Sequence, residues 1–329
     1  MNNTKSLNIL VLIISIIYSL IFVYIIPWTE IKGTIFADLL NYTDRIVYLL
    51  DGGQERDFYG LSILFSEVIW KYILIYLGAL FTDPYVVVSV ISLFSLTIYT
   101  YVLLKKTNNY FLLILLFNPM FVDLIMGQIR IAFAFSLLVI AYELIISKRF
   151  IYLAFVLILI SPLIHTAMLI ILALSIYIYL FNKYFSNIKY YYLWAIVTAL
   201  ILSLFLKFGA DIILLSFGDK RANYEGVIES SSVKFSIFWF ILSILLVIFS
   251  RTIKKEENNI IIFSLIMMGI FFFSSLINAY GQRYVAISIP LILISISYLR
   301  RNYQFYIYTL VFLYLILQYY YWAKIFNLI

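Results

Sequence analysis

Three polar side chains that could take part in chemistry lie within long apolar stretches of the sequence: Arg130, His165 and Arg283. An ionisable side chain in a membrane segment is costly, so it marks a candidate functional site. The arginine guanidinium stays charged and presents a planar fork that matches phosphate oxygens. Two such arginines facing one cavity predict a phosphate or diphosphate ligand. His165, the single histidine, is suited to proton transfer near neutral pH.

Each of these residues also has a simpler interpretation. Arg130 and Arg283 could extend from helix ends toward lipid headgroups. His165 could bond to a backbone carbonyl at a helix end. The sequence alone leaves both interpretations open.

The composition predicts an all-α, polytopic membrane protein. Of the 329 residues, 65% are hydrophobic and 12% are charged, against roughly 25% charged in soluble domains. The mean hydropathy is +1.06. The absence of Cys excludes a disulfide framework and thiolate metal sites, and one His is too few for a histidine metal cluster. We expect no cofactor and assign no metal ligands, while the acidic residues of the outer loops leave metal dependence open.

Apolar stretches follow one another along nearly the whole chain. They cover about 7–26, 61–81, 85–104, 110–126, 128–147, 150–164, 165–182, 190–208, 233–250, 258–277, 282–299 and 303–323. Since a span needs about 20 residues, these stretches predict a bundle of about 11–12 transmembrane helices. We expect one integral membrane domain over 1–329, with outer loops at about 27–60 and 209–232.

The distribution of positive charge predicts which loops are cytoplasmic. The net charge of +7 is spread over small clusters, so no basic patch is left for nucleic acid. From residue 105 onward every second connection is basic: Lys105-Lys106, Lys148-Arg149, Lys183 with Lys189, Arg251 with Lys254-Lys255, and Arg300-Arg301. The positive-inside rule makes these connections cytoplasmic. Arg130, His165 and Arg283 then lie at similar depth near the outer face.

Twelve full crossings cannot satisfy this charge pattern, so one stretch must not cross. The best candidate is 61–81, where Glu67 and Lys71 are spaced to pair on one helix face. We expect part of loop 27–60 and the start of 61–81 to lie along the outer interface as amphipathic or re-entrant helix. Eleven crossings remain, with the C-terminus outside. The alternative, in which 61–81 spans and the first helix is reversed, stays open.

Three motifs carry a resemblance to a known family. They are Asn118-Pro119-Met120-Phe121 followed by Gln128-Ile129-Arg130, then Ser161-Pro162-Leu163-Ile164-His165-Thr166-Ala167, and finally Gln282-Arg283-Tyr284. With the order and hydropathy of nearly the whole chain, they resemble the EpsG family and the related Wzy-type polymerases of bacterial surface polysaccharide. One departure is in the first outer loop. The family often has an acidic residue shortly before a Gly-aromatic pair that opens the second helix. Here Asp57 precedes Phe58-Tyr59-Gly60, and Glu67 precedes Trp70 without a Gly.

The resemblance implies a GT-C-like membrane glycosyltransferase. Such an enzyme would transfer a growing O-antigen, capsule or exopolysaccharide chain from undecaprenyl diphosphate to a lipid-linked repeat unit, at the outer face of the bacterial inner membrane. Arg130 and Arg283 would stabilise the diphosphate leaving group. His165 would accept the proton of the acceptor hydroxyl, with Asp57 as the rival base.

The resemblance also suggests further contacts. The expected substrate-binding residues are Asn118, Gln128, Tyr280, Gln282 and Tyr284. The expected partners are the undecaprenyl-diphosphate-linked oligosaccharide, the lipid bilayer, a chain-length regulator and a flippase.

Two other classes of protein remain as alternatives. A flippase or transporter of lipid-linked oligosaccharide should show internal repeats and polar residues near the middle of several spans, but the sequence shows no repeat. A membrane acyltransferase acting on polysaccharide would also use a single His. An acidic partner near that His would favour this alternative, and the residues from Ser161 to Ile170 contain none.

Overall fold

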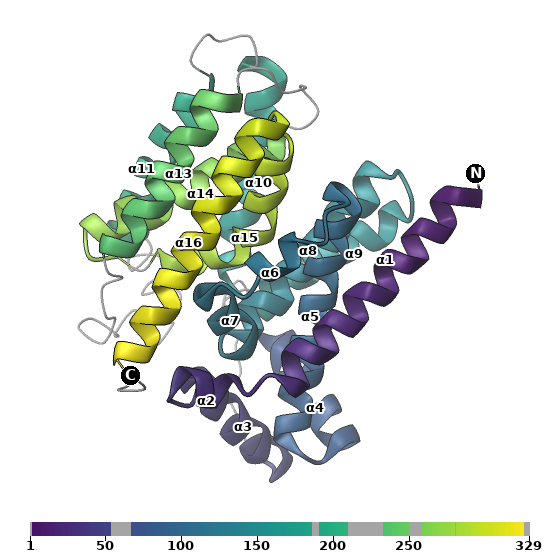
Figure 1. Ribbon diagram of the computed structural model, residues 1–329. Helices are drawn as coiled ribbons and strands as arrows, with labels where there is room; N and C mark the ends of the chain where they lie inside the picture. The colour runs from purple at the N-terminus through teal and green to yellow at the C-terminus, as the bar shows by residue number, and fades with distance from the viewer. Residues whose placement is uncertain are drawn as a thin grey trace. The chain divides into compact units, whose positions relative to one another are not determined.

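The structure is a computed structural model that describes residues 2–53, 67–185, 191–209, 233–250, 258–279 and 281–325. In these residues all regular structure is helical, with fifteen α-helices, one π-helical segment and no strand (Figure 1). This confirms the all-α class predicted from the sequence. The chain divides into two compact units, Met1–Leu169 with Leu315–Ile329, and Ile170–Tyr314. We describe each unit by itself.

The helices that lie wholly in the first unit follow one another from the N-terminus to Ile164. They are α1 (Asn2–Leu20), the π-helical η1 (Ile21–Ile25), α2 (Trp28–Lys32), α3 (Ala37–Leu50), α4 (Val68–Phe81), α5 (Pro84–Thr107), α6 (Leu112–Leu115), α7 (Pro119–Met126), α8 (Ile129–Ile146) and α9 (Ile151–Ile164). The second unit contains α11 (Tyr191–Phe208), α13 (Val233–Phe249), α14 (Asn258–Leu276) and α15 (Gln282–Ser297). Both units take residues from α10 (Ala167–Phe185) and α16 (Arg301–Ile325).

Several of these helices are long and apolar enough to cross a membrane. Among the described residues they are Asn8–Ile25, Pro84–Thr107, Ile129–Ile146, Ala167–Phe185, Tyr191–Phe208 and Asn258–Leu276. Shorter apolar helices are α4, α9, α13 and α15. These segments are those of a multi-pass membrane protein. With 14 residues, α4 is about 21 Å long, less than the roughly 30 Å hydrocarbon core. Its failure to cross stays a prediction.

The described part of the first outer loop, 27–53, forms helices α2 and α3. In α3 the side chains of Tyr42, Ile46 and Leu49 are buried at helical spacing, while Asp44 is exposed. This is the amphipathic helix that the sequence predicted for part of the loop. The buried face packs on α4, where a Cβ at Gly78 would lie 3.1 Å from Ile46. The position of α3 at the membrane interface remains a prediction.

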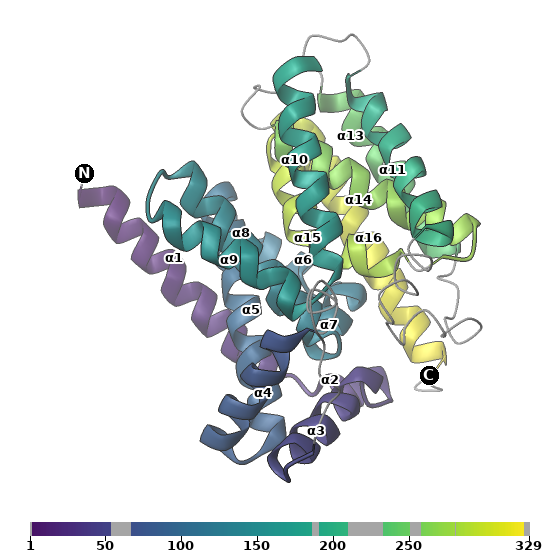
Figure 2. The ribbon, with the colours of Figure 1, turned by 180° about the vertical axis from the view of Figure 1, so that it is seen from behind.

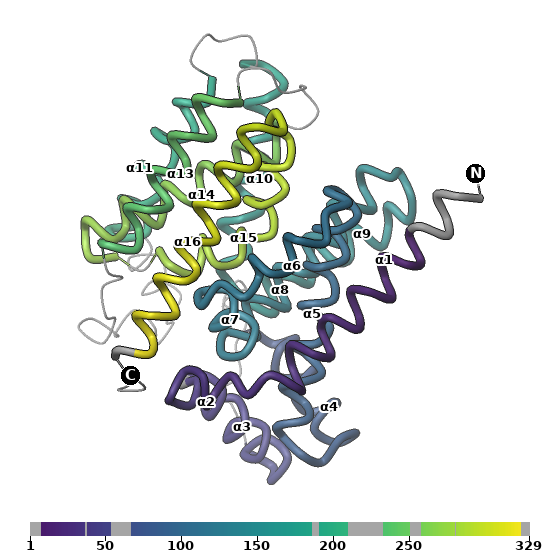
Figure 3. Tube along the Cα trace, in the orientation of Figure 1, coloured from purple at the N-terminus to yellow at the C-terminus, as the bar shows by residue number. Residues whose placement is uncertain are grey.

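The apolar stretch 110–126, which looks continuous in the sequence, is broken into α6 and α7, as the tube in Figure 3 shows. Proline disfavours helical backbone at the residue before it, and Asn118, just before Pro119, has φ −53° and ψ 126°. The break frees carbonyl oxygens that a membrane cannot hydrate. The hydroxyl of Tyr319 donates to the Phe117 carbonyl at 2.6 Å, and that of Tyr18 donates to the Leu113 carbonyl at 2.9 Å.

Helices α5, α8 and α9 form the centre of the first unit, and α8 and α9 lie side by side in Figures 1 and 2. The Tyr99 hydroxyl of α5 donates to the Ala132 carbonyl of α8 at 2.8 Å. Near the C-terminal ends of α5 and α8, both Lys105 and Lys106 lie 2.8 Å from oxygens of Glu143. The basic end of α5 therefore lies beside the end of α8 that precedes Lys148-Arg149. This agrees with placing both clusters on one side of the membrane.

In the second unit, α14 is the central helix and packs against α11, α13 and α15. Small residues allow close approach of these helices, as is common in membranes. A Cβ on Gly269 would lie 2.6 Å from the Cβ of Ala199 in α11. The hydroxyls of Ser236 and Ser275 are 2.6 Å apart, which joins α13 to α14. The second unit is thus built from apolar helices with serine contacts between them.

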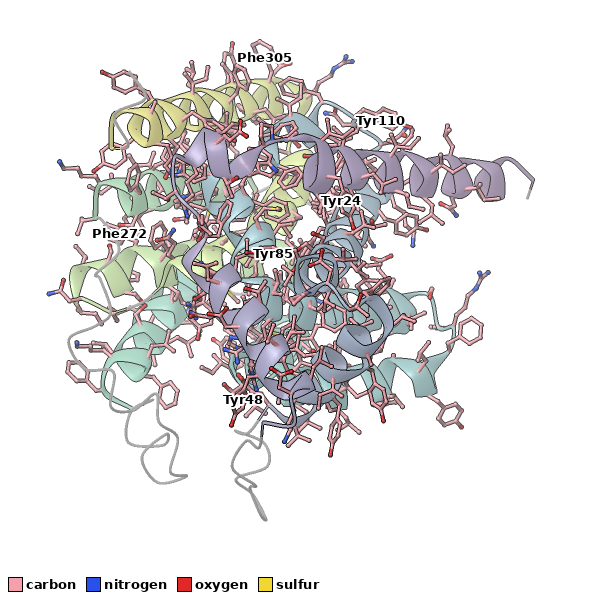
Figure 4. The ribbon with its side chains drawn as sticks, turned by 90° about the horizontal axis from the view of Figure 1, so that it is seen from below. Tyr24, Tyr48, Tyr85, Tyr110, Phe272 and Phe305 are labelled. Atoms are coloured by element: carbon pink, nitrogen blue, oxygen red, sulfur yellow. The ribbon has the colours of Figure 1, made fainter. Side chains whose placement is uncertain are left out.

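Large aromatic side chains are exposed in both units. Tyr24, Tyr48, Tyr85 and Tyr110 of the first unit and Phe305 of the second are examples (Figure 4). In a membrane protein such side chains face lipid or the membrane interface, where tyrosine is enriched. Their exposure is therefore expected of a chain with 30 Tyr and 29 Phe residues.

Candidate functional site

Arg130, at the start of α8, forms a salt bridge with Glu67, the residue that precedes α4. Both side chains are largely buried, with 19% of Arg130 and 8% of Glu67 exposed. The Nε atom of Arg130 is buried and has no hydrogen-bond partner in the described part of the chain. A buried charge pair is costly to form unless its geometry is good, and removing one partner strands the other. Arg130 is therefore an internal, paired cation and not a side chain that extends toward lipid headgroups.

Glu67 reaches this position through an unusual backbone conformation. Its φ of 53° and ψ of 40° place it in the left-handed region, which non-glycine residues rarely adopt. Its side chain makes no capping hydrogen bond to α4. The turn instead directs the carboxylate to Arg130. The pairing of Glu67 with Lys71 that the sequence suggested is replaced by this contact with a residue far away in the chain.

His165, at the end of α9, lies level with Arg130 along the packed helices α8 and α9. The Ser161 hydroxyl donates to the Ala134 carbonyl at 2.7 Å, which fixes the register of the two helices. Ser161 is four residues before His165, and Ala134 is four residues after Arg130. Because the helices run in opposite directions, His165 and Arg130 both lie about 6 Å beyond that hydrogen bond. The first unit therefore brings two of the three predicted polar residues to one end of a helix pair.

The hydrogen bonding of His165 fixes its tautomer. Its Nδ1 accepts a hydrogen bond from the Ala167 backbone N–H at 3.1 Å, and the residue is 7% exposed. In the neutral ring the proton must then be on Nε2. In that tautomer Nε2 is a hydrogen-bond donor. The general-base role predicted for His165 stays a prediction.

A second salt bridge, between Lys32 and Asp123, also involves the α7–α8 region. The Nζ of Lys32 in α2 is 3.0 Å from Oδ1 of Asp123 in α7, and the Gln128 amide nitrogen donates to Oδ2 of Asp123 at 2.9 Å. The same ammonium lies 4.2 Å from the centroid of the Phe36 ring. Segments before α3 and before α4 are thus each joined to the α7–α8 region by an ion pair.

Two of the predicted substrate-binding residues have structural roles in the first unit. Asn118 caps α7, since its Oδ1 accepts from the Met120 N–H at 3.0 Å, and it is 1% exposed. Gln128 holds Asp123 through its amide nitrogen. The Nδ2 of Asn118 and the Oε1 of Gln128 are buried and have no protein partner among the described residues. Their proposed contact with substrate is not tested by the structure.

Arg283, Gln282 and Tyr284 lie in the second unit, in the first turn of α15. Arg283 and Gln282 are partly exposed and Tyr284 is buried. The glycine before them, Gly281, serves packing against α14, because a Cβ there would lie 2.7 Å from the Ser274 Cβ. Asp57 and Tyr280 lie outside the residues that the structure describes. A cavity shared by Arg130, His165 and Arg283 stays a prediction.

Sequence reasoning did not include Glu67, Lys32 or Asp123 among the site residues. Glu67 and Lys71 gave a local signal for pairing within one helix, and that signal was misleading. Two indications were available: Asp123 lies near Arg130 in a very apolar segment, and Glu67 lies shortly before Trp70, near where the resemblance leads one to expect an acidic residue. In the described ranges no group of three or more His, Cys, Asp or Glu residues could hold a metal ion.

The comparison with protein families gives a match over most of the chain. The model of the EpsG family matches residues 15–328. No curated protein and no solved structure matches the chain. The match covers the segments that hold Arg130, His165 and Arg283, and membership implies a role in exopolysaccharide biosynthesis. This chain, with its apolar helices and a paired arginine at the start of α8, belongs to the EpsG family.

Proposed function

We propose that this protein is a polysaccharide polymerase of the bacterial inner membrane. It would transfer a growing glycan from undecaprenyl diphosphate to the sugar of a lipid-linked repeat unit, with the site facing the cell exterior. The observation that carries the proposal is the buried guanidinium of Arg130, level with His165 at one end of α8 and α9. Family membership supplies the biological setting.

The chemistry requires stabilisation of a diphosphate leaving group. Negative charge grows on its oxygens as the glycosidic bond breaks, so a positioned cation lowers the barrier more than it strengthens ground-state binding. Arg130 supplies this cation in the proposal, and a similar role for Arg283 stays a prediction from the sequence. His165 contributes an N–H from Nε2 to the same oxygens, in keeping with its bond to the Ala167 N–H. Gln128, Gln282 and Tyr284 remain candidates for contacts with the headgroup or the sugars.

A flippase for the same lipid-linked oligosaccharide is the second candidate, and one observation favours it. Transporters often use broken helices near the middle of the membrane, and α6 and α7 form such a break. In this chain the Tyr319 hydroxyl donates to the Phe117 carbonyl at the break, and the Tyr18 hydroxyl donates to the Leu113 carbonyl of α6, so neighbouring helices hold the break through side-chain hydrogen bonds. We therefore place the polymerase first. A chain-length regulator and a separate flippase are expected to work with it.

The test is a reaction with purified protein in liposomes that contain a defined undecaprenyl-diphosphate repeat unit. A polymerase converts the single units into a ladder of longer lipid-linked products, which gel electrophoresis and mass spectrometry resolve. A flippase moves labelled units between leaflets without lengthening them. Movement without lengthening would refute the polymerase and support the second candidate.

A further inference from the structure

We propose that Glu67 is the proton acceptor for the incoming sugar hydroxyl, and that Arg130 holds its carboxylate in an ion pair until a diphosphate binds. The inference rests on the proposed function, because it assigns a role within the same site. It concerns a residue that sequence reasoning did not place there. The contacts of acidic and basic side chains in the first unit lead to it.

The first observation is the geometry of Glu67. The residue adopts left-handed backbone, which is strained for a non-glycine residue, and its side chain does not cap the helix that follows. Strained residues of this kind persist where surrounding structure enforces them, often at functional sites. Here the strained residue places its carboxylate against the guanidinium of Arg130. The backbone conformation of Glu67 therefore allows the contact with Arg130, and the side chain does not cap α4.

The second observation concerns three other acidic or basic side chains on α7, α8 and α9, each of which has contacts away from the Arg130 guanidinium. Both oxygens of Asp123 are bonded, one to Lys32 and the other to Gln128. The Nδ1 of His165 accepts from a backbone N–H. Glu143 lies near the opposite end of α8, where it binds two lysines. Glu67 is the carboxylate that shares its cation with the expected ligand.

Sharing one cation couples the two steps of the reaction. Arginine carries five N–H donors, so its guanidinium can bind a phosphate oxygen and a carboxylate together. A diphosphate beside Arg130 would compete with Glu67 for these donors. Binding of the donor would therefore loosen the ion pair and leave the carboxylate of Glu67 able to bond to the acceptor hydroxyl.

The reaction step is then balanced. The acceptor oxygen forms a bond to the anomeric carbon of the growing glycan, and the bond from that carbon to the phosphate oxygen breaks. The electron pair of the broken bond goes to undecaprenyl diphosphate, whose charge Arg130 stabilises. The proton of the hydroxyl goes to Glu67 and is released to water after the product leaves.

The experiment compares wild type with Glu67→Gln, and uses Glu30→Gln as the matched control because Glu30 is exposed in α2. Binding of radiolabelled undecaprenyl-diphosphate repeat unit and its single-turnover extension are measured in lipid nanodiscs. We expect Glu67→Gln to bind the donor as tightly as wild type or more tightly, because a competing carboxylate is gone. Extension should fall about 10²- to 10⁴-fold, the usual loss for a general base. Glu30→Gln should match wild type in both measurements.

Two results would overturn the inference while leaving the polymerase intact. Extension by Glu67→Gln within about threefold of wild type would exclude Glu67 as the base. Loss of donor binding together with extension would make Glu67 a positioning residue for Arg130. If wild type binds the donor but does not extend it, the proposed function itself fails, and the inference fails with it.

A second variant keeps the test valid if removal of the charge unfolds the protein. Glu67→Asp retains the carboxylate and moves it by about one bond length, roughly 1.5 Å. A displacement of this size from the productive geometry can lower a reaction rate about 10²-fold. The rate of extension should therefore fall by more than tenfold, while donor binding stays unchanged. Unchanged extension by Glu67→Asp would contradict a base held at a fixed position.

Discussion

Replacing Arg130 by lysine tests the site most directly, because the change keeps the charge and removes the planar fork. In wild type the guanidinium binds Glu67 and, in the proposed complex, a phosphate oxygen as well. A lysine ammonium is a point charge at the end of a flexible chain and cannot span both groups in one plane. Arg130→Lys should therefore lose about one charge-assisted hydrogen bond to the diphosphate.

The magnitude follows from that single bond. A hydrogen bond to a charged group contributes about 1.5–3 kcal/mol. At about 1.36 kcal/mol per tenfold in rate, kcat/KM for chain extension should fall about 10- to 150-fold. In cells, the same variant should accumulate single lipid-linked repeat units and make shorter polymer. The liposome assay gives the rate, and gel electrophoresis of extracted glycolipids gives the chain length.

The matched control for this variant is Arg149→Lys. Arg149 is exposed in the basic connection after α8, near Lys148. Its replacement by lysine should leave extension and polymer length unchanged. Equal, wild-type activity of Arg130→Lys and Arg149→Lys would show that Arg130 is a structural cation, and the diphosphate would have to be bound elsewhere.

Three further predictions concern His165, the glycine before α15 and the topology. His165→Gln, which keeps an N–H donor, should retain more extension activity than His165→Ala; equal loss in both would argue against donation from Nε2. Gly281→Ala should lower the thermal unfolding temperature in detergent, at a cost of about 1–3 kcal/mol, since its Cβ would lie 2.7 Å from that of Ser274; an unchanged temperature would contradict this packing. Asn278→Cys should react with an impermeant thiol reagent from outside, and Ser147→Cys should not; the reverse pattern would invert the topology.

Hydropathy alone predicted the all-α class, because a bilayer permits only structures that satisfy their own backbone hydrogen bonds. It did not predict the break between α6 and α7. The signal was present in Asn118-Pro119, a capping residue followed by a residue suited to the first helical position. The surrounding residues are so apolar that 110–126 looks like a single span. The hydroxyls of Tyr319 in α16 and Tyr18 in α1 bond to the Phe117 and Leu113 carbonyls in this region, and sequence spacing gives no indication of them.

The partners of the candidate residues were also beyond sequence reasoning. Glu67 and Arg130 are 63 residues apart. No helical periodicity in the sequence predicts a contact between the residue before α4 and the first turn of α8. The local rule for residues four apart on a helix favoured Lys71 instead. That rule fails because Glu67 is not part of the helix: its left-handed backbone turns the side chain away from α4.

The two glycines beside the arginines show how the structure changes the argument about ligand access. A small residue such as Gly127 or Gly281 lets a headgroup approach the backbone only where the space beside it is open. In the structure a Cβ on Gly127 would lie 2.9 Å from the Asp123 carbonyl oxygen and 3.4 Å from Phe36, so protein atoms already fill that space. A headgroup at this position must therefore contact the side chain of Arg130 and not the backbone beside it. This makes the guanidinium, and the carboxylate of Glu67 that binds it, the part of the site where substrate and protein compete.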